Sequence, residues 1–125
     1  VGTKNPMYCT SLGKAILAYS DEETCGQILA RMKFKKHTER TITDRESLKR
    51  ELERVRDQGY ALDEREVEEH MECVGAPVFG PDGSFVGALS VSSLYKPTED
   101  YEQLGRLTAK KAAEVSKLLG FLGKI

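Results

Sequence analysis

Residues 73–94 of the chain read CVGAPVFGPDGSFVGALSVSSL, and this stretch determines the fold that we expect. Two runs rich in strand-forming residues, 73–79 and 85–94, flank Gly80-Pro81-Asp82-Gly83, a sequence typical of a tight turn. The stretch therefore predicts an antiparallel β-hairpin. Because Pro77 has no N–H to donate to a neighbouring strand, we expect it at an edge of the sheet or at a bulge.

Segments with helical spacing of apolar residues lie on both sides of the hairpin, and strand character is also present at residues 60–62. The chain therefore predicts an α/β fold, in which an antiparallel sheet is flanked by helices and a pocket lies between them. The expected helices cover about residues 11–19, 21–34, 44–58 and 98–119. The apolar face expected of the last helix consists of Leu104, Leu107, Ala112, Val115, Leu118 and Leu119.

The composition is that of one ordinary globular domain with a single core, since the chain has 125 residues. Its 19 basic and 20 acidic residues give a net charge of -1, which argues against a free-standing nucleic-acid binder, because such proteins usually carry a basic excess. No apolar run approaches the roughly 20 residues of a membrane span. The three cysteines are an odd number, and we expect them to be free thiols in a reducing cytoplasm.

Six segments follow one another at a characteristic spacing. They are residues 2–7 with 11–18 (GTKNPM, SLGKAILA), Thr38 with 41–44 (TITD), 56–63 (RDQGYALD), 73–79 (CVGAPVF), 88–92 (ALSVS) and 113–120 (AEVSKLLG). Taken together they resemble the C-terminal effector-binding domain of the IclR-type bacterial transcription regulators. The resemblance covers nearly the whole chain, and it depends on the order of the segments more than on any one of them.

The resemblance implies a GAF-like sensor fold and assigns residues 1–125 to the effector-binding domain of a longer, cytoplasmic regulator. It also implies a winged helix-turn-helix domain on the N-terminal side, outside this chain, through which alone DNA would be bound. The implied partners are a small organic acid or related metabolite as effector, and further copies of the chain in a homodimer or homotetramer. No membrane contact and no cofactor is expected. The sequence leaves open whether the effector favours repression or activation.

The start of the first helix is a candidate anion site. Backbone N–H groups at a helix start can hold a carboxylate without any side chain, and Gly13 would leave room for a ligand beside the backbone. The alternative is that Thr10 and Ser11 only cap the helix. The family's ligand contacts fall on the positions of Ser11 and Leu12, so the resemblance favours binding.

Further ligand contacts are predicted on the strands. Ser90 and Ser92 are two residues apart, which turns both hydroxyl groups to one face, either a cavity or solvent. Met71 and Cys73 share a face for the same reason, and Asp63 would either accept a hydrogen bond from a ligand or cap a loop. The resemblance favours ligand binding at all five positions. The complete set of predicted ligand-binding residues is Ser11, Leu12, Asp63, Met71, Cys73, Ser90 and Ser92.

Two positions depart from the family pattern. His70 stands where the family usually has Gly, and Arg65-Glu66 stands where it usually has two adjacent acids. His70 would either enter the pocket and pair with an anion or lie on the surface of a charged loop. These departures leave the identity of the effector open.

Other functions find less support in the residues. Cys73 and His70 are three apart but lack a third group that would orient the histidine, and Ser90 lacks a G-x-S-x-G elbow. We therefore predict no catalytic residues and no enzyme activity. The H-x-x-C spacing offers two ligands, too few to close a tetrahedral site, so we predict no metal site. The remaining alternative is a GAF-like dimerisation module without a working ligand pocket.

Overall fold

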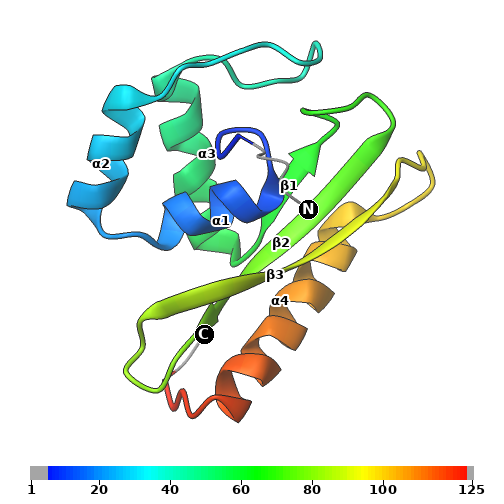
Figure 1. Cartoon of the computed structure of the whole chain (residues 1–125). Coiled ribbons are helices and arrows are strands. Elements are labelled where there is room, and N and C mark those ends of the chain that lie inside the picture. Colours follow the sequence, from blue (N-terminus) through cyan, green and yellow to red (C-terminus); the bar gives the residue numbers. More distant parts are fainter. Residues whose placement is uncertain (1–5, 124–125) are drawn as a thin grey trace, which may run out of the picture.

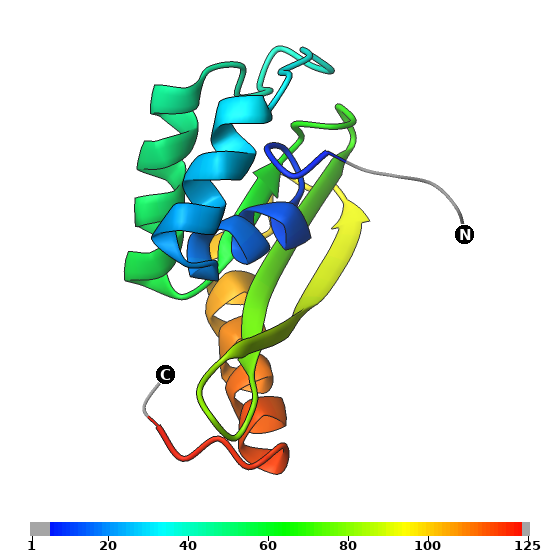
Figure 2. The same cartoon turned by 60° about the vertical axis from the view of Figure 1, so that its left-hand side comes forward.

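One antiparallel sheet separates two layers of helices (Figure 1). The computed structural model describes residues 6–123, so residues 2–5 of the expected loop before the first helix lie outside the described part. Helices α1, α2 and α3 lie on one side of the sheet and α4 on the other, as the turned view in Figure 2 shows. The elements are α1 (Ser11–Tyr19), α2 (Glu22–Arg31), α3 (Arg45–Gln58), β1 (Ala61–Glu64), β2 (Met71–Phe79), β3 (Phe85–Leu94) and α4 (Tyr101–Leu118).

The sheet has the strand order β1-β2-β3, and both pairings are antiparallel. The predicted hairpin is present, since β2 pairs with β3 along its length, with a register shift between Val78 and Phe79. Pro77 lies just before this shift and beyond the last pair with β1, Ala61↔Gly75. Its expected position at an edge or a bulge is thereby confirmed.

Apolar side chains of α1 and α3 form the core on one side of the sheet. Leu17, Leu48 and Val55 are fully buried there. At the end of α3, Gly59 adopts the left-handed conformation with φ 87°, and its N–H donates to Val55 O at 2.8 Å. This cap ends the helix at the expected place and leads the chain into β1.

Helix α2 ends at Arg31, three residues before the expected end. The side chain of Arg45 at the start of α3 donates from Nε to Leu29 O at 2.7 Å and from Nη2 to Ala30 O at 3.3 Å. Carbonyl groups in the last turn of a helix have no partner within the helix, and Arg45 supplies one. Apolar spacing in the sequence does not indicate this contact between two helices. The helix predicted from that spacing was therefore too long.

The apolar face expected of α4 is only partly correct. The residues that α4 buries are small, namely Gly105, Thr108, Ala112 and Ser116. A Cβ on Gly105 would lie 2.4 Å from the ring of Tyr60, so the helix approaches the sheet too closely for large side chains at this point. Leu104 packs partly against the core, whereas four of the expected residues are exposed: Leu107, Val115, Leu118 and Leu119.

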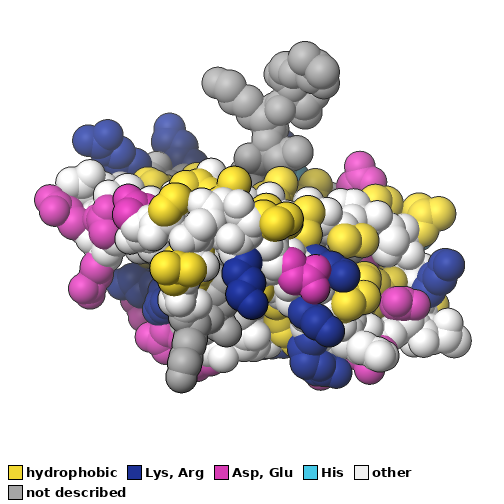
Figure 3. All heavy atoms as spheres, turned by 90° about the horizontal axis from the view of Figure 1, so that it is seen from below, with side chains coloured by type: hydrophobic (Ala, Val, Ile, Leu, Met, Phe, Trp, Pro, Cys, Tyr) yellow, Lys and Arg dark blue, Asp and Glu magenta, His cyan; other side chains and the backbone are white. Residues whose placement is uncertain are grey.

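Large apolar side chains also remain exposed on β3, among them Val86, Leu89, Val91 and Leu94. On the face seen in Figure 3, hydrophobic side chains form several groups between charged ones. The described residues, 6–123, include no helix with the length and hydropathy of a membrane span.

Candidate ligand-binding site

A cavity of about 470 Å³ lies between the start of α1, the turn after β1 and the β2-β3 hairpin. All seven residues predicted to bind a ligand line it: Ser11, Leu12, Asp63, Met71, Cys73, Ser90 and Ser92. The fold thus brings together residues of α1 and of all three strands. The volume falls within the roughly 300–1,000 Å³ of typical small-molecule sites.

The first turn of α1 forms one wall of the cavity. Thr10 is the N-cap residue, and its Oγ1 accepts from Gly13 N–H at 3.1 Å. Ser11 is therefore not the cap, and it is buried at the cavity wall. The amide groups of Ser11 and Leu12 have no acceptor among residues 6–123, which leaves two donors for an oxygen of a ligand.

The space beside Gly13 is filled by the protein itself. A Cβ at this position would lie 2.4 Å from Met7 Cα and 2.6 Å from Thr10 Oγ1. The glycine therefore admits the loop that precedes α1, and because Gly13 also lines the cavity, a ligand beside its backbone stays a prediction. A second close approach occurs at Gly75, where a Cβ would lie 3.1 Å from the backbone carbonyl of Ser11 and would push α1 away from β2.

One face of the sheet forms the opposite wall. The strand register pairs Cys73 with Asp63 on one side and with Ser92 on the other, and it pairs Gly75 with Ser90. Cross-strand partners share a face, so these side chains point to the same side of the sheet. Cys73 Sγ donates to Ser92 Oγ at 3.2 Å. Ser92 is exposed because the cavity is open there, and it belongs to the cavity wall as well as to the surface.

The two walls differ in electrostatic character. Burial raises the pKa of the Asp63 carboxyl, although the Glu66 N–H at 2.8 Å and the Lys14 ammonium favour its ionised form. Burial also raises the pKa of the Cys73 thiol, which keeps this group neutral. The cavity lining therefore combines backbone donors at the start of α1 with a carboxyl group and with neutral thiol and hydroxyl groups of the strands.

Six further residues line the cavity and were not predicted as ligand contacts: Met7, Thr10, Gly13, Ile16, Val67 and Glu68. Ile16 lies one helical turn after Leu12, so helical spacing held a signal for it. Val67 and Glu68 lie in an irregular turn whose direction no local pattern indicates. His70, in the same turn, is exposed and does not line the cavity.

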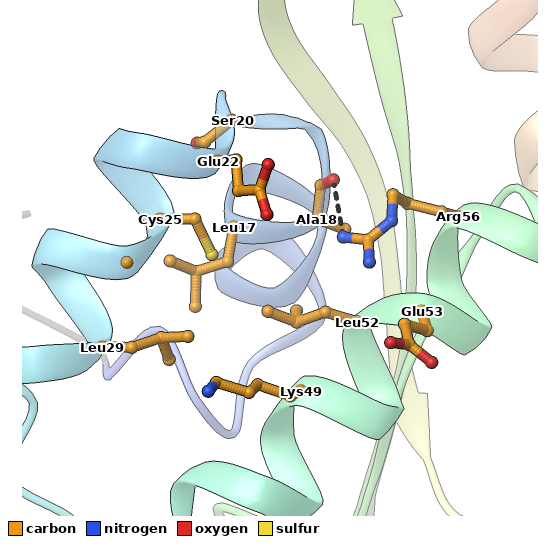
Figure 4. Close-up of a pocket in the computed structure, with 11 residues that line it drawn as sticks. Leu17, Ala18, Ser20, Glu22, Cys25, Leu29, Lys49, Leu52, Glu53 and Arg56 are labelled. Carbon is orange, nitrogen blue, oxygen red and sulfur yellow. Dashed lines mark hydrogen bonds between the residues drawn. The ribbon is translucent and has the colours of Figure 1, made fainter.

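A larger groove of about 650 Å³ lies between α2 and α3 and was not predicted. Figure 4 shows Lys49 and Arg56 extending from α3 toward α2, on either side of Leu52. Arg56 Nη1 donates to Ala18 O at 3.3 Å. Carboxylates also line the groove, so it offers charges of both signs, and none of the predicted ligand-binding residues lies in it.

The described residues offer no activated thiol and no metal cluster. Burial raises the pKa of the Cys9 thiol to about 12, and it raises the pKa of Cys25 as well. A reactive cysteine needs the opposite shift. Within residues 6–123, no group of three or more His, Cys, Asp or Glu side chains is arranged to hold a metal ion.

This geometry defines the class of α/β domains that have an antiparallel sheet between helices and a cavity of small-molecule size at a helix start. The chain belongs to the IclR family, since residues 1–117 match the family model described as bacterial transcriptional regulator IclR C-terminal. Its fold is the GAF-like fold of these C-terminal domains.

Three similar proteins support this assignment. The HTH-type transcriptional regulator KdgR of Escherichia coli (strain K12) is 37% identical over 123 residues, which are 97% of this chain and 47% of that regulator. The crystal structure of Thermotoga maritima IclR has a TM-score of 0.86 and 36% identity, covering 97% of this chain and 50% of the other. The inducer-binding domain of PobR from Acinetobacter, a double mutant in complex with 3-hydroxybenzoic acid, has a TM-score of 0.82 and 28% identity, covering 94% and 69%.

These matches also bear on length and on catalysis. The chain spans about half the length of the first two proteins. The similar proteins are transcriptional regulators, in agreement with the prediction that the chain is not an enzyme.

Proposed function

We propose that this chain is the effector-binding domain of a cytoplasmic IclR-family regulator and that the cavity beside α1 binds a small organic acid or a related metabolite. The observation that carries the proposal is the cavity, which is lined by Ser11 and Leu12, whose amide groups have no acceptor among residues 6–123, and by oxygen- and sulfur-bearing side chains of the strands. The complex of the PobR inducer-binding domain with 3-hydroxybenzoic acid supports an organic acid as the class of ligand.

The charges of the cavity suggest how such a molecule would be oriented. Its carboxylate would accept from the amide groups at the start of α1, where the helix dipole also favours an anion. Asp63 would repel that carboxylate, so the two groups belong at opposite ends, and Asp63 would accept from a hydroxyl group of the ligand. Ser90 and Ser92 would hydrogen-bond to oxygen atoms between these ends.

In the full-length regulator, DNA would be bound by an N-terminal winged helix-turn-helix domain, within a homodimer or homotetramer. The effector would change the spacing of the DNA-binding domains by binding one arrangement of the subunits better than another. Binding of the effector and of DNA must then be coupled. Equal effector affinities of the full-length protein with and without operator DNA would contradict this coupling.

A thermal-shift screen tests the binding function directly. The chain is mixed with glyoxylate, pyruvate, keto-deoxy sugar acids and hydroxybenzoates, and the melting temperature Tm is recorded for each. A ligand that binds only the folded state raises Tm, so we expect a selective rise of several degrees with one class of acid. The absence of any rise across these acids would contradict the choice of ligand class.

A dimerisation module without a ligand pocket is the second candidate, and the exposed apolar side chains of β3 and α4 favour it. Val86 and Leu94 are 56% and 67% exposed, and Leu107 is 51% exposed. Such a module would show a Tm that rises with protein concentration and does not respond to any organic acid. A sensor responds to the acid at a fixed protein concentration.

A further inference from the structure

The side chain of Lys14 is completely buried, with 0% of it exposed, although it carries an ammonium group. It lies on α1, one turn after Ser11. Its Nζ donates to Leu62 O at 2.8 Å and to Glu66 Oε2 at 2.6 Å, and it lies 4.0 Å from Glu51 Oε2. A buried charge is tolerated only with such partners, so the location of Lys14 depends on β1 and on the turn after it.

Glu66 connects this ammonium group to Asp63. The N–H of Glu66 donates to Asp63 Oδ1 at 2.8 Å, and its Oε2 also accepts from Glu64 N–H at 3.1 Å. Thr41 Oγ1 donates to Glu66 O at 2.6 Å and fixes the turn from a second direction. The carboxyl group that forms one end of the cavity is thus held by a turn that is bonded to α1 through Lys14.

The charges around this connection are unbalanced. The single ammonium group of Lys14 faces the carboxylates of Glu51, Asp63 and Glu66. Burial raises the pKa of both Asp63 and Glu66, and Lys14 favours the ionised form of each. The titratable groups that face Asp63 or Lys14 from the packed elements are Cys9, Glu51, Glu64, Glu66, Glu72 and Cys73.

We propose that Lys14 is a positioning residue of the ligand site: its buried ammonium group locks α1, which carries Ser11 and Leu12, to the turn that holds Asp63. The lock fixes the separation between the donor end and the acceptor end of the cavity, and so the length of ligand that fits. This role deepens the proposed function and rests on it. Lys14 itself does not line the cavity.

The test uses the double variant Lys14→Met/Glu66→Gln in the full chain. It removes both charges of the pair, so that neither Lys14 nor Glu66 is left charged without the other, and the amide introduced by Glu66→Gln keeps an oxygen for the Glu64 N–H. The control is Lys111→Met/Glu114→Gln, an exposed pair 3.3 Å apart on α4 that receives the same substitutions. Measurements without ligand are hydrogen exchange of the backbone amides at positions 64 and 66 and the pH midpoint of the Asp63 carboxyl by NMR. Affinity is measured by calorimetry with 3-hydroxybenzoate and with pyruvate.

The lock predicts three changes in the double variant and none in the control. Exchange at the two amides becomes at least tenfold faster, the Asp63 midpoint shifts because its turn is no longer held and the charges of Lys14 and Glu66 are both gone, and the affinity for whichever acid binds falls at least tenfold. A folded double variant with an unchanged Asp63 midpoint and affinity within twofold of the parent chain would overturn the proposal.

If the double variant does not fold, Glu66→Gln alone is used, for which the lock predicts faster exchange at Glu64 and a severalfold loss of affinity, and unchanged values overturn it. If neither acid binds the parent chain, that result counts against the proposed function, and the two ligand-free measurements decide the role of Lys14.

Discussion

At the scale of single residues, the hydroxyl group of Ser92 offers a test of the cavity wall. It accepts from Cys73 Sγ at 3.2 Å and lines the cavity, whereas Ser93 pairs with Glu72 and alternates to the other face of the strand. We expect Ser92→Ala to weaken binding of the acid found in the screen by about 1 kcal/mol, or about fivefold, as one hydrogen bond is lost. Isothermal titration calorimetry measures the loss. The matched control Ser93→Ala should stay within about twofold, and equal losses would contradict the assignment of the face.

A second residue with a testable property is Glu72, which is buried with 4% of its side chain exposed. Burial raises its pKa from 4.5 to about 7, and Glu64 opposite it contributes, although Arg65 Nε lies 3.6 Å away. The protonated form is therefore favoured in the folded state. Its contribution to stability is fully present below pH 4.5 and is lost as the pH rises through about 7.

Glu72→Gln removes this titration. The variant should match the parent chain in free energy of unfolding near pH 4.5 and exceed it at pH 8 by about 3 kcal/mol, since one pKa unit corresponds to about 1.4 kcal/mol. Urea unfolding at several pH values measures the difference. Glu69→Gln, which changes an exposed glutamate in the turn before β2, serves as control. A difference between variant and parent that does not change with pH would contradict the assignment.

Residues of the cavity could be predicted from the sequence where a local period fixes their direction. Side chains alternate along a strand, so Ser90 and Ser92 were expected on a common face, and so were Met71 and Cys73. All four line the cavity. The burial of Lys14 could not be predicted, because charged side chains are usually exposed and its partner Glu66 is 52 positions away. Neither residue of the pair carries a local pattern that points to the other.

At the scale of the helices, two glycines in helix interiors should respond oppositely to the same substitution. Alanine is favoured over glycine in a helix by about 0.5–1 kcal/mol. At Gly26 in α2 an added Cβ meets no atom within 4 Å, so Gly26→Ala should raise the free energy of unfolding by about that amount. At Gly13 in α1 the Cβ would lie 2.4 Å from Met7 Cα, and Gly13→Ala should lower it by about 1–3 kcal/mol. Chemical unfolding of both variants measures these changes, and stabilisation by Gly13→Ala would show that the loop before α1 is not packed as described.

Local sequence patterns predict the bounds of some helices and strands and not of others. The turn of the hairpin, β3 and α1 have the expected bounds, because a turn sequence and a capping residue are short-range signals, whereas β2 begins two residues before the expected start at Cys73. The end of α2 and the buried face of α4 depend on Arg45 and Tyr60, which belong to other elements. Apolar spacing predicted that the large residues of α4 are buried, whereas the close approach of Tyr60 leaves room only for small residues on the buried face.

At the scale of the whole molecule, the cavity beside α1 and the groove between α2 and α3 are the two candidate ligand sites. The cavity beside α1 combines backbone donors that have no acceptor within residues 6–123 with residues of all three strands, whereas the larger groove lies between α2 and α3 and carries charges of both signs. Volume alone would favour the groove. The backbone donors of the smaller cavity favour it as the site for an acid, and the sequence predicted part of its lining without predicting the groove.

An NMR titration of the chain with the acid that gives the largest rise in Tm tests the location of the effector site. Amide chemical shifts report where the ligand binds. We expect the largest chemical-shift changes at the amides of the cavity residues and none in the groove between α2 and α3. The cavity residues are Ser11, Leu12, Asp63, Cys73 and Ser92, and the groove residues are Gly26, Lys49 and Arg56. Largest changes along α2 and α3, or on the exposed faces of β3 and α4, would contradict the assignment of the cavity beside α1 as the effector site.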